Sequence, residues 1–365
     1  MNRILPFLII LTLVLAAAHF FIFRTATRSY PDGTPWTAVL AMLLAVGLVS
    51  IPAGFILSLT KFKKQMKWLS WIGFIWMGFF HLMFFSSLAD FVMNMIYPHG
   101  FSNWTLYFTF LIGAWALYKG LRAPQLVTHE IQGPAIMQGM TLVQVSDLHV
   151  GLLHLNGKWL SRVVDIVNQQ RADFFAITGD LVEGSYGEVS PQLEILKTAY
   201  AKIDRFYITG NHEYIHGSGP WENRLANLGY TTLHNENKVF NFNNAKILFA
   251  GVPDRMVKRF DPRLRSVPDE ALKTNEKVDY KILLAHEPAS RWDMKIQTCD
   301  LILSGHTHGG QIFPFGLLVR LAQPVVSGFK QMGEVLVFAH QGTGLWGPPM
   351  RWFSRSEIVL FKWIV

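Results

Sequence analysis

The chain has almost no cysteine. Cys299 is the only one in 365 residues, so no disulfide can form within one copy of the chain. This excludes the small disulfide-rich scaffolds of secreted proteins and suits a reducing compartment. No activating pattern surrounds Cys299, and we therefore expect it to be a small buried hydrophobic side chain and not a nucleophile.

Charged residues are also scarce. They make up 16% of the chain, whereas hydrophobic residues make up 50%. These averages hide a change in composition near residue 120, because the first third is almost continuously apolar and the remainder resembles a soluble domain. We expect a transmembrane domain over residues 1–121, a linker and lead-in over residues 122–140, and a soluble domain over residues 141–365.

Four long apolar runs fill the first domain. They cover residues 4–23, 36–59, 68–97 and 104–121. A spanning helix needs about 20 apolar residues, so each run is long enough, the last only just. The first run exceeds the apolar stretch of a signal peptide, which is about 7 to 15 residues, and three more runs follow it. The sequence thus predicts four transmembrane helices.

The charges of the loops predict the orientation of these helices, because cytoplasmic loops carry an excess of lysine and arginine. One side of the predicted bundle carries seven basic residues, which are Arg3, Lys61, Lys63, Lys64, Lys67, Lys119 and Arg122. The other side has only Arg24 and Arg28. This predicts a multi-pass protein of the cell (inner) membrane with both termini, and the soluble domain, in the cytoplasm.

Three ionisable residues lie within the apolar runs: His19, His81 and Asp90. Such groups are candidates for an ion path. His19 and Asp90 lie near helix ends, so transport would depend on His81 alone. A membrane sensor or carrier with a regulatory soluble domain therefore stands as the alternative to an enzyme.

The net charge of +8 does not by itself indicate nucleic acid, because lysines beside the membrane account for part of it and are attracted to anionic lipid. No convincing basic stripe with interleaved aromatic residues is present, so no nucleic-acid partner is expected. The membrane bilayer is the expected partner.

Short apolar runs alternate with helical patterns beyond residue 140. Seven runs have the length of buried strands: 142–145, 174–177, 206–208, 247–250, 282–285, 301–303 and 335–338. Residues 160–167 have the spacing of an amphipathic helix, and residues 221–228 predict another that ends at Gly229. This alternation is typical of a layered α/β domain.

Five of these strands are followed by Asp, Asn or His. The five motifs are Asp147-Leu148-His149, Gly179-Asp180, Gly210-Asn211-His212-Glu213, His286 and Gly305-His306-Thr307-His308. Each alone is usually a turn or a paired polar group. Ligands gather at the carboxyl ends of strands in open α/β sheets, so these side chains can converge. Oxygen donors and imidazoles without thiolates suit two mid-row cations better than a structural zinc ion.

The ordered set resembles the calcineurin-like metallophosphoesterases, whose motifs are Asp-x-His, Gly-Asp, Gly-Asn-His-Asp/Glu, His and Gly-His-x-His. The resemblance covers residues 124–365, and residues 341–351 are similar to the closing segment of the membrane-associated bacterial subgroup of the YaeI and YkuE type. It implies that the four transmembrane helices are followed by a four-layer αββα sandwich, in which two mixed sheets pack face to face between helices.

The resemblance also implies roles for the site residues. Seven side chains would hold two divalent cations: Asp147, His149 and His308 the first, Asn211, His286 and His306 the second, and Asp180 both. His212 would not be a ligand and would stand beside the scissile phosphate. Protein phosphatases of this superfamily carry an Asp three residues after the bridging aspartate, where this chain has Glu183.

These roles imply a hydrolase in which two cations lower the pKa of a bridging water, so that hydroxide attacks phosphorus. Mn²⁺ is the expected metal, with Fe or Zn as alternatives. The resemblance to the YaeI and YkuE subgroup implies a phosphodiesterase that acts on a phosphate ester or pyrophosphate. Because the domain is tethered to a membrane, we expect a substrate at the membrane surface, such as a phospholipid or a lipid-linked pyrophosphate.

Two further segments each keep two interpretations. Residues 254–265 contain five basic side chains and would contact phosphate or anionic lipid, or form a solvated loop. Residues 312–329 are apolar with few charges, Arg320 among them, and would lie on the membrane near the site or pack into the core.

Overall fold

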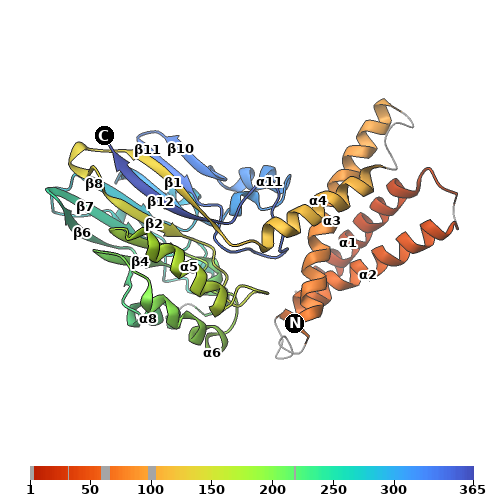
Figure 1. Cartoon of the computed structure of the whole chain (residues 1–365), viewed down its shortest axis with the longest axis horizontal. Coiled ribbons are helices and arrows are strands. Elements are labelled where there is room, and N and C mark those ends of the chain that lie inside the picture. Colours follow the sequence, from red (N-terminus) through yellow and green to blue (C-terminus); the bar gives the residue numbers. More distant parts are fainter. Residues whose placement is uncertain (1–3, 32, 59–65, 98–103, 218) are drawn as a thin grey trace. The chain divides into compact units, whose positions relative to one another are not determined.

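The computed structural model describes residues 4–31, 33–58, 66–97, 104–217 and 219–365 (Figure 1). The chain divides into two compact units. The helical unit comprises Met1–Leu121 with Gly347–Trp352, and the sheet unit comprises Arg122–Trp346 with Phe353–Val365. Four of the basic residues behind the predicted orientation, Arg3, Lys61, Lys63 and Lys64, lie outside the described residues.

Four long helices form the helical unit. They are α1 (Ile4–Thr27), α2 (Pro35–Ser58), α3 (Lys67–Ile96) and α4 (Trp104–Leu121). Among the described residues, three stretches are long and apolar enough to cross a membrane: Ile10–Thr27, Pro35–Gly54 and Lys67–Ile96. These helices indicate membrane association, and three of the four predicted spans are supported. α4 is not one of the three.

Small and polar residues join the helices of this unit. Gly54 on α2 and Gly73 on α3 approach so closely that a Cβ on Gly54 would lie 3.0 Å from Gly73 Cα. Trp76 Nε1 donates a hydrogen bond to His19 Nε2 over 3.2 Å, and Asp90 pairs with Arg28 at 3.1 Å. His19 and Asp90 therefore take part in polar contacts within the bundle, and the ring of His81 lies 4.9 Å from that of Phe85.

The segment Gly347–Trp352 belongs to the helical unit although it lies near the end of the chain. The backbone N–H of Arg351 donates to the carbonyl of Ala116 on α4 over 2.9 Å. Gly120 leaves room for the backbone of Pro349. The sequence had indicated only a closing segment of the soluble domain here.

Two six-stranded sheets form the sheet unit. The first has, in spatial order, β1 (Gln125–Gln132), β12 (Glu357–Ile364), β2 (Thr141–Val145), β3 (Phe174–Thr178), β4 (Asp204–Ile208) and β5 (Thr231–Thr232). The second has β10 (Gly328–Met332), β11 (Val335–Ala339), β9 (Leu301–Ser304), β8 (Tyr280–Leu284), β7 (Ala245–Gly251) and β6 (Glu236–Phe242). All seven predicted strands are present.

Residues 122–140, expected to be a linker and lead-in, contain strand β1 and the short helix η1 (Ala135–Met137). β1 pairs in parallel with β12 along its whole length. Only Ile131 of its side chains is fully buried, because β1 is an edge strand. The weak apolar pattern of this edge strand is why the sequence did not indicate it.

The main core lies between the two sheets, which pack face to face. Phe206 of the first sheet stacks on Phe249 of the second at a ring distance of 4.5 Å, and Phe174 lies 4.6 Å from the same ring. Large apolar side chains that alternate along buried strands produce this packing, because every second residue points toward the other sheet. The facing sheets are the α/β arrangement expected from the resemblance.

Helices cover the outer faces of the sheets. α5 (Gly157–Gln170) buries Leu160, Val163, Val164 and Val167, as its spacing predicted, and Asn156 caps its first turn. The second predicted helix is α8 (Gly219–Asn227). The remaining helices are short: α6 (Tyr186–Val189), η2 (Ser190–Thr198), α7 (Asn211–Ile215), α9 (Val257–Phe260), α10 (Pro268–Ala271), η3 (Pro288–Asp293), η4 (His308–Gly310) and α11 (Phe315–Ala322).

Parallel pairing places the polar motifs at one edge of each sheet. β2, β3 and β4 are parallel to one another, and so are β7, β8 and β9. Their carboxyl ends therefore point the same way within each sheet, and the loops that follow them can meet across the sandwich.

Candidate dinuclear metal centre

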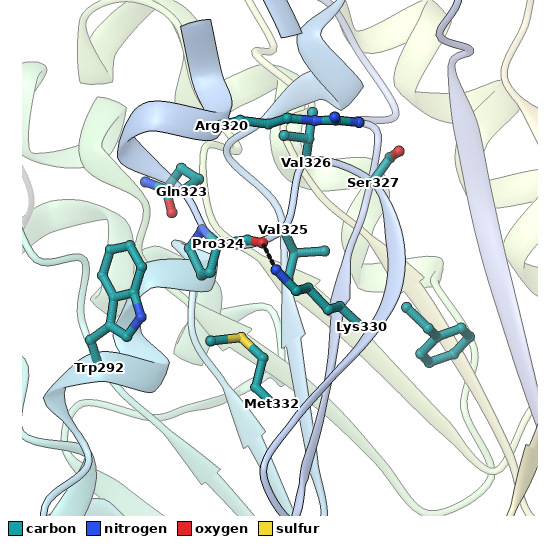
Figure 2. Close-up of a pocket in the computed structure, with 10 residues that line it drawn as sticks. Trp292, Arg320, Gln323, Pro324, Val325, Val326, Ser327, Lys330 and Met332 are labelled. Carbon is teal, nitrogen blue, oxygen red and sulfur yellow. Dashed lines mark hydrogen bonds between the residues drawn. The ribbon is translucent and has the colours of Figure 1, made fainter. Parts of the chain in front are cut away.

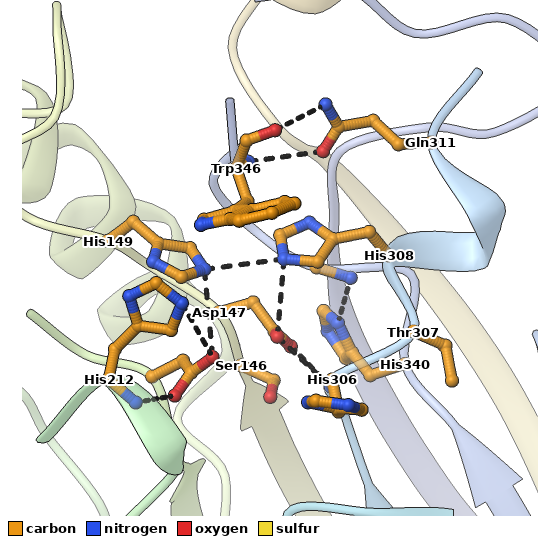
Figure 3. Close-up of polar contacts among 12 residues, drawn as sticks. Ser146, Asp147, His149, His212, His306, Thr307, His308, Gln311, His340 and Trp346 are labelled. Atoms are coloured by element: carbon orange, nitrogen blue, oxygen red, sulfur yellow. Dashed lines mark hydrogen bonds and ion pairs between the residues drawn. The ribbon is translucent and has the colours of Figure 1, made fainter. Parts of the chain in front are cut away.

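All eight predicted site residues come together in the loops at the carboxyl ends of the strands. Figure 3 shows Asp147, His149, His212, His306 and His308 among them. Asp147 and His149 follow β2, and Asp180 follows β3. Asn211 and His212 open α7 after β4. The second sheet supplies the rest, with His286 after β8 and His306 and His308 after β9. Seven of the eight are buried, and His306 is partly buried.

A first group of donor atoms consists of Asp147, His149 and His308. His308 Nε2 lies 3.4 Å from Asp147 Oδ1 and 3.3 Å from His149 Nε2. The ligand atoms of the three residues all lie within 4.8 Å of one another. Imidazole nitrogens and a carboxylate oxygen that point at one spot are donors of the kind that zinc, iron and manganese accept.

A second group consists of Asp180, His286 and His306. His286 Nε2 lies 3.2 Å from Asp180 Oδ2, while its Nδ1 is 2.7 Å from the carbonyl oxygen of Thr178. Because the carbonyl can only accept, Nδ1 carries a proton, and it is Nε2 that would donate its electron pair to a bound cation. Asn211 Oδ1 lies 3.1 Å from His306 Nδ1 and adds an amide oxygen to the group.

Asp180 lies between the two groups. Its Oδ2 atom is 3.2 Å from His286 Nε2 in the second group and 3.9 Å from His149 Nε2 in the first. Its Oδ1 atom accepts a hydrogen bond of 2.9 Å from the backbone N–H of His212, which fixes the rotation of the carboxylate. A carboxylate held at this position faces both sets of donors.

The backbone is strained at several of these residues. Of eleven described non-glycine residues with positive φ, five are predicted ligands: Asp147, His149, Asp180, His306 and His308. A left-handed conformation costs free energy in a non-glycine residue and tends to persist at functional sites. These loops therefore hold side-chain directions that relaxed turns would not provide.

Two glycines make the close approach of the loops possible. A Cβ on Gly305 would collide with Ser146 Oγ and with the carboxylate of Asp147. A Cβ on Gly210 would collide with the carboxylate of Asp180. Only glycine lets these two backbones pass so near the predicted ligands.

Glu213 is a buried carboxyl group that joins the loops after β3 and β4. It accepts hydrogen bonds from the backbone N–H groups of Asp180, Leu181 and Gly210, at 3.1, 2.7 and 2.6 Å. Burial and the nearby charge of Asp180 raise the pKa of Glu213 to about 8. The motif contained this residue, but its role in joining the β3 and β4 loops became visible only in the structure.

Glu183 contacts three histidines at the rim of the cluster. Its Oε2 atom lies 2.6 Å from His212 Nδ1 and 3.1 Å from His149 Nδ1, and its Oε1 atom lies 3.1 Å from His216 Nε2. Burial by itself would raise the pKa of Glu183, but contacts with these three histidines hold it well below its usual range. Sequence reasoning missed His216, although its position one helical turn after His212 was a usable signal.

The charges of the cluster fit bound cations. Burial acts to raise the pKa values of Asp147 and Asp180, yet the surrounding histidines lower both, so the two carboxylates are ionised although they are buried. Burial lowers the pKa of His212, but Asp180 and Glu183 raise it to about 9. Buried carboxylates next to imidazole donors are a favourable environment for divalent cations.

Trp346 and Gln311 form part of the rim (Figure 3). Gln311 Nε2 donates to the carbonyl of Trp346 over 2.8 Å, and the backbone N–H of Trp346 donates to Gln311 Oε1 over 3.1 Å. The Trp346 ring lies 6.2 Å from that of His212. An aromatic side chain thus stands beside the candidate centre.

A two-sheet α/β unit that gathers histidines and aspartates at its strand ends is suited to a dinuclear metal site. Residues 140–310 match the family described as calcineurin-like phosphoesterase. An uncharacterized metallophosphoesterase of Aquifex aeolicus is 31% identical over 222 residues, which cover 60% of this chain and 83% of the relative. The chain belongs to the calcineurin-like phosphoesterase family.

Other relatives are longer than the matched part. An uncharacterized metallophosphoesterase of Helicobacter pylori is 36% identical over 67% of this chain and 65% of its own length. A zebrafish (Danio rerio) protein named transmembrane protein with metallophosphoesterase domain is 32% identical over 69% of this chain and 60% of its own length. The chain therefore matches somewhat less than two thirds of the length of these curated relatives.

Two other sequence interpretations can be compared with the structure. Cys299 is buried, as expected, and burial raises the pKa of its thiol to about 12, which makes it a poor nucleophile. In the basic segment, Arg255 pairs with Asp293 at 2.7 Å, and the exposed Arg263 pairs with Asp261 at 2.8 Å. These pairs favour the solvated loop.

Proposed function

We propose that this chain is a membrane-associated phosphoesterase that hydrolyses a phosphodiester or a pyrophosphate with the help of two divalent cations. The observation that carries the proposal is the position of Asp180, whose Oδ2 atom faces a donor group on each side. In this proposal one cation is held by Asp147, His149 and His308 and the other by Asn211, His286 and His306, with Asp180 shared. Mn²⁺ is the proposed metal, with Fe or Zn as alternatives.

Bound cations would supply Lewis-acid activation of a water nucleophile and neutralise charge at phosphorus. The side chains of the protein would orient the substrate and supply a proton. His212 keeps its Nδ1 atom against Glu183, which leaves Nε2 directed at the cluster, 4.0 Å from Asp180. A protonated imidazole in that position can stabilise a developing oxyanion or donate its proton to the leaving oxygen. Glu183 acts through His212 and is a positioning residue.

The proposed substrate is a phosphoester or pyrophosphate attached to a lipid. The support comes from the helical unit, since its three apolar stretches would keep the sheet unit beside a membrane. The zebrafish and bovine relatives whose names describe them as transmembrane proteins are consistent with this arrangement. We further propose that α4 is a fourth span and that the sheet unit lies on the cytoplasmic side of the inner membrane, as the loop charges predict.

The direct test is hydrolysis of a soluble chromogenic phosphodiester by the purified full chain, after chelation and after addition of Mn²⁺, Fe²⁺ or Zn²⁺ in turn. Activity should disappear with chelator and return with at least one metal. Full activity in the presence of chelator, with no metal bound, would refute the metal-dependent mechanism. A second panel of phospholipids and lipid-linked pyrophosphates tests the substrate, because rapid turnover of soluble diesters without any lipid hydrolysis would exclude the lipid assignment.

A further inference from the structure

Helix α11 presents an apolar face that the sheet unit leaves open. None of its eight residues is buried. At about 3.6 residues per turn, Leu318 and Leu321 lie on the side of the helix opposite Gly316. Gly316 lies on the side of the helix that packs against the rest of the sheet unit, since a Cβ there would lie 3.5 Å from Gly310 Cα. Leu318 and Leu321 are accordingly 51% and 83% exposed.

Aromatic residues extend this surface beyond the helix. Phe313 packs its ring edge against Phe353 at 5.5 Å, and Phe353 is 80% exposed. We call the exposed apolar side chains together the docking face, which consists of Phe313, Phe315, Leu317, Leu318, Leu321 and Phe353. An open apolar surface of this kind marks a place where a protein meets another apolar phase.

The chain itself indicates what that phase is. Trp346 and Phe353 are the two points at which the sheet unit passes into and out of Gly347–Trp352 of the helical unit. Phe353 belongs to the docking face. Trp346 is hydrogen-bonded to Gln311, which precedes Phe313 of the docking face by two residues. A second connection runs from the end of α4 at Leu121 to the start of β1 at Gln125, a span of at most about 14 Å. Both connections lead to the unit that carries the three apolar stretches.

Positive charge borders the docking face. Arg320 and Lys330 line a cavity of about 550 Å³ beside α11, with Lys330 Nζ donating to the carbonyl of Pro324 over 3.0 Å (Figure 2). Within the described part of the chain neither cation forms an ion pair with a carboxylate. A helix with an apolar face and basic residues at its edge is suited to lie in the interface of a bilayer that contains anionic lipid.

We propose that the docking face rests in the surface of the phospholipid bilayer in which the helical unit sits, with Arg320 and Lys330 at the level of the lipid headgroups. α11 follows the loop of His306 and His308 by only a few residues. Docking would therefore hold the candidate metal centre at the membrane surface. The proposal assigns the membrane contact to α11, whereas Ile312 before the helix and Val325 after it are buried in the sheet unit.

Because Cys299 is the only cysteine, the Cys299→Ala variant of the full chain has no thiol of its own. In this background a nitroxide is attached to Leu318→Cys or Leu321→Cys. The protein is then placed in nanodiscs of phosphatidylcholine and phosphatidylglycerol. The control is Ile203→Cys, because Ile203 is 40% exposed and directly precedes β4, at the opposite end of the strands. Collision rates with oxygen, which partitions into lipid, and with a water-soluble nickel chelate are then compared.

The ratio of oxygen to nickel collisions should be severalfold higher at 318 and 321 than at 203. A ratio at both positions equal to that at 203 would overturn the proposal, because the face would then be in water. Labels that are immobilised and closed to both reagents would also overturn it, because protein would then cover the face, either a second copy or the helical unit. Cys299 is buried, so the nitroxide reagent should not react with it in the folded protein. Repeating the measurement with Cys299 retained therefore checks that Cys299→Ala has not disturbed the fold.

The measurement requires no turnover, so it is independent of the proposed function. A catalytically inactive protein with lipid-exposed labels would refute the proposed phosphoesterase function and support the docking of the face on the membrane. An active enzyme with water-exposed labels would support the proposed function and refute the docking. In nanodiscs without phosphatidylglycerol the ratio at 318 should fall, and Arg320→Gln with Lys330→Gln should remove that dependence. No effect of phosphatidylglycerol would refute the role given to the two cations.

Discussion

Glu183 Oε2 lies 2.6 Å from His212 Nδ1, the closest of the three contacts that this carboxylate makes with histidines. Protein phosphatases of the superfamily carry an aspartate at the corresponding position. The longer glutamate side chain nevertheless reaches the same imidazole. Burial lowers the pKa of His212, but Asp180 and Glu183 raise it to about 9. With Nδ1 held against Glu183, Nε2 faces the cluster, 4.0 Å from Asp180 Oδ2.

Replacing Glu183 should reduce turnover without abolishing metal binding. We expect Glu183→Gln to lower kcat on a soluble chromogenic diester by roughly 10- to 100-fold, since an unoriented imidazole loses part of the contribution of a general acid. KM should change little. The reduction should be absent when Glu183→Gln is introduced into His212→Ala, because the two residues act as one unit.

The matched control is Glu130→Gln, a change of the same kind at an exposed residue of β1. It should leave kcat and metal content unaltered. Additive losses in the double variant of Glu183 and His212 would show that Glu183 acts on something other than His212, and the positioning role would have to be abandoned.

His216 should support Glu183 from its other oxygen. Its Nε2 atom lies 3.1 Å from Glu183 Oε1. We expect His216→Ala to lower kcat by roughly tenfold, as is common for residues one step removed from a metal site. His216→Gln should recover much of the loss, because the amide can donate to the same oxygen. Equal activity of the Ala and Gln variants would mean that this contact plays no part in turnover.

Asp180 and His212 should separate metal binding from turnover. Asp180→Asn removes the charge shared by both donor groups, so we expect both bound metal and activity to be lost. His212→Ala should retain the metal and lose roughly 10²- to 10⁴-fold in kcat. Metal analysis by mass spectrometry beside kinetics gives both readings, and a His212→Ala enzyme of full activity would remove that residue from the mechanism.

The parts of the fold that could be predicted are those that depend on a short continuous stretch of the sequence. The seven predicted strands are buried runs, and each ligand motif directly follows a strand. β6 was not predicted because its alternation is only half-buried. β12, although mostly buried, belongs to the first sheet through pairing with β1 and β2, more than 200 residues away in the chain. Pairing over such a distance leaves no local signal.

The candidate site divides in the same way. The motifs indicated the eight predicted residues, because each of the five motifs lies in the loop at the carboxyl end of a strand. The spacing of His212 and His216 places them one helical turn apart, but the contact of Glu183 with both depends on how the β3 loop folds over α7. Likewise, the apolar run over residues 312–329 could not be assigned to core or surface until α11 was seen with its leucines exposed.

The orientation of the protein in the membrane can be tested with reporters fused after Val365. The excess of basic residues on one side predicts a cytoplasmic C-terminus. A green fluorescent protein fusion should therefore fluoresce, and an alkaline phosphatase fusion should be inactive. A fusion after residue 31, between the first two helices, is the internal control and should give the opposite pair of results. An active phosphatase at the C-terminus would place the sheet unit outside the cytoplasm.

Gly305 should tolerate no side chain, because a Cβ there would collide with Ser146 and with the carboxylate of Asp147. We expect Gly305→Ala to cost about 1–3 kcal/mol of stability through overpacking and to displace a predicted metal ligand. The matched control is Gly187→Ala in α6, where a Cβ would meet nothing within 4 Å and the backbone suits alanine. Thermal unfolding with metal analysis should therefore distinguish the two variants, with Gly187→Ala resembling the parent protein. If Gly305→Ala kept both its metal and its stability, the loops after β2 and β9 would have room to separate, and the close approach that defines the first donor group would not be required for metal binding.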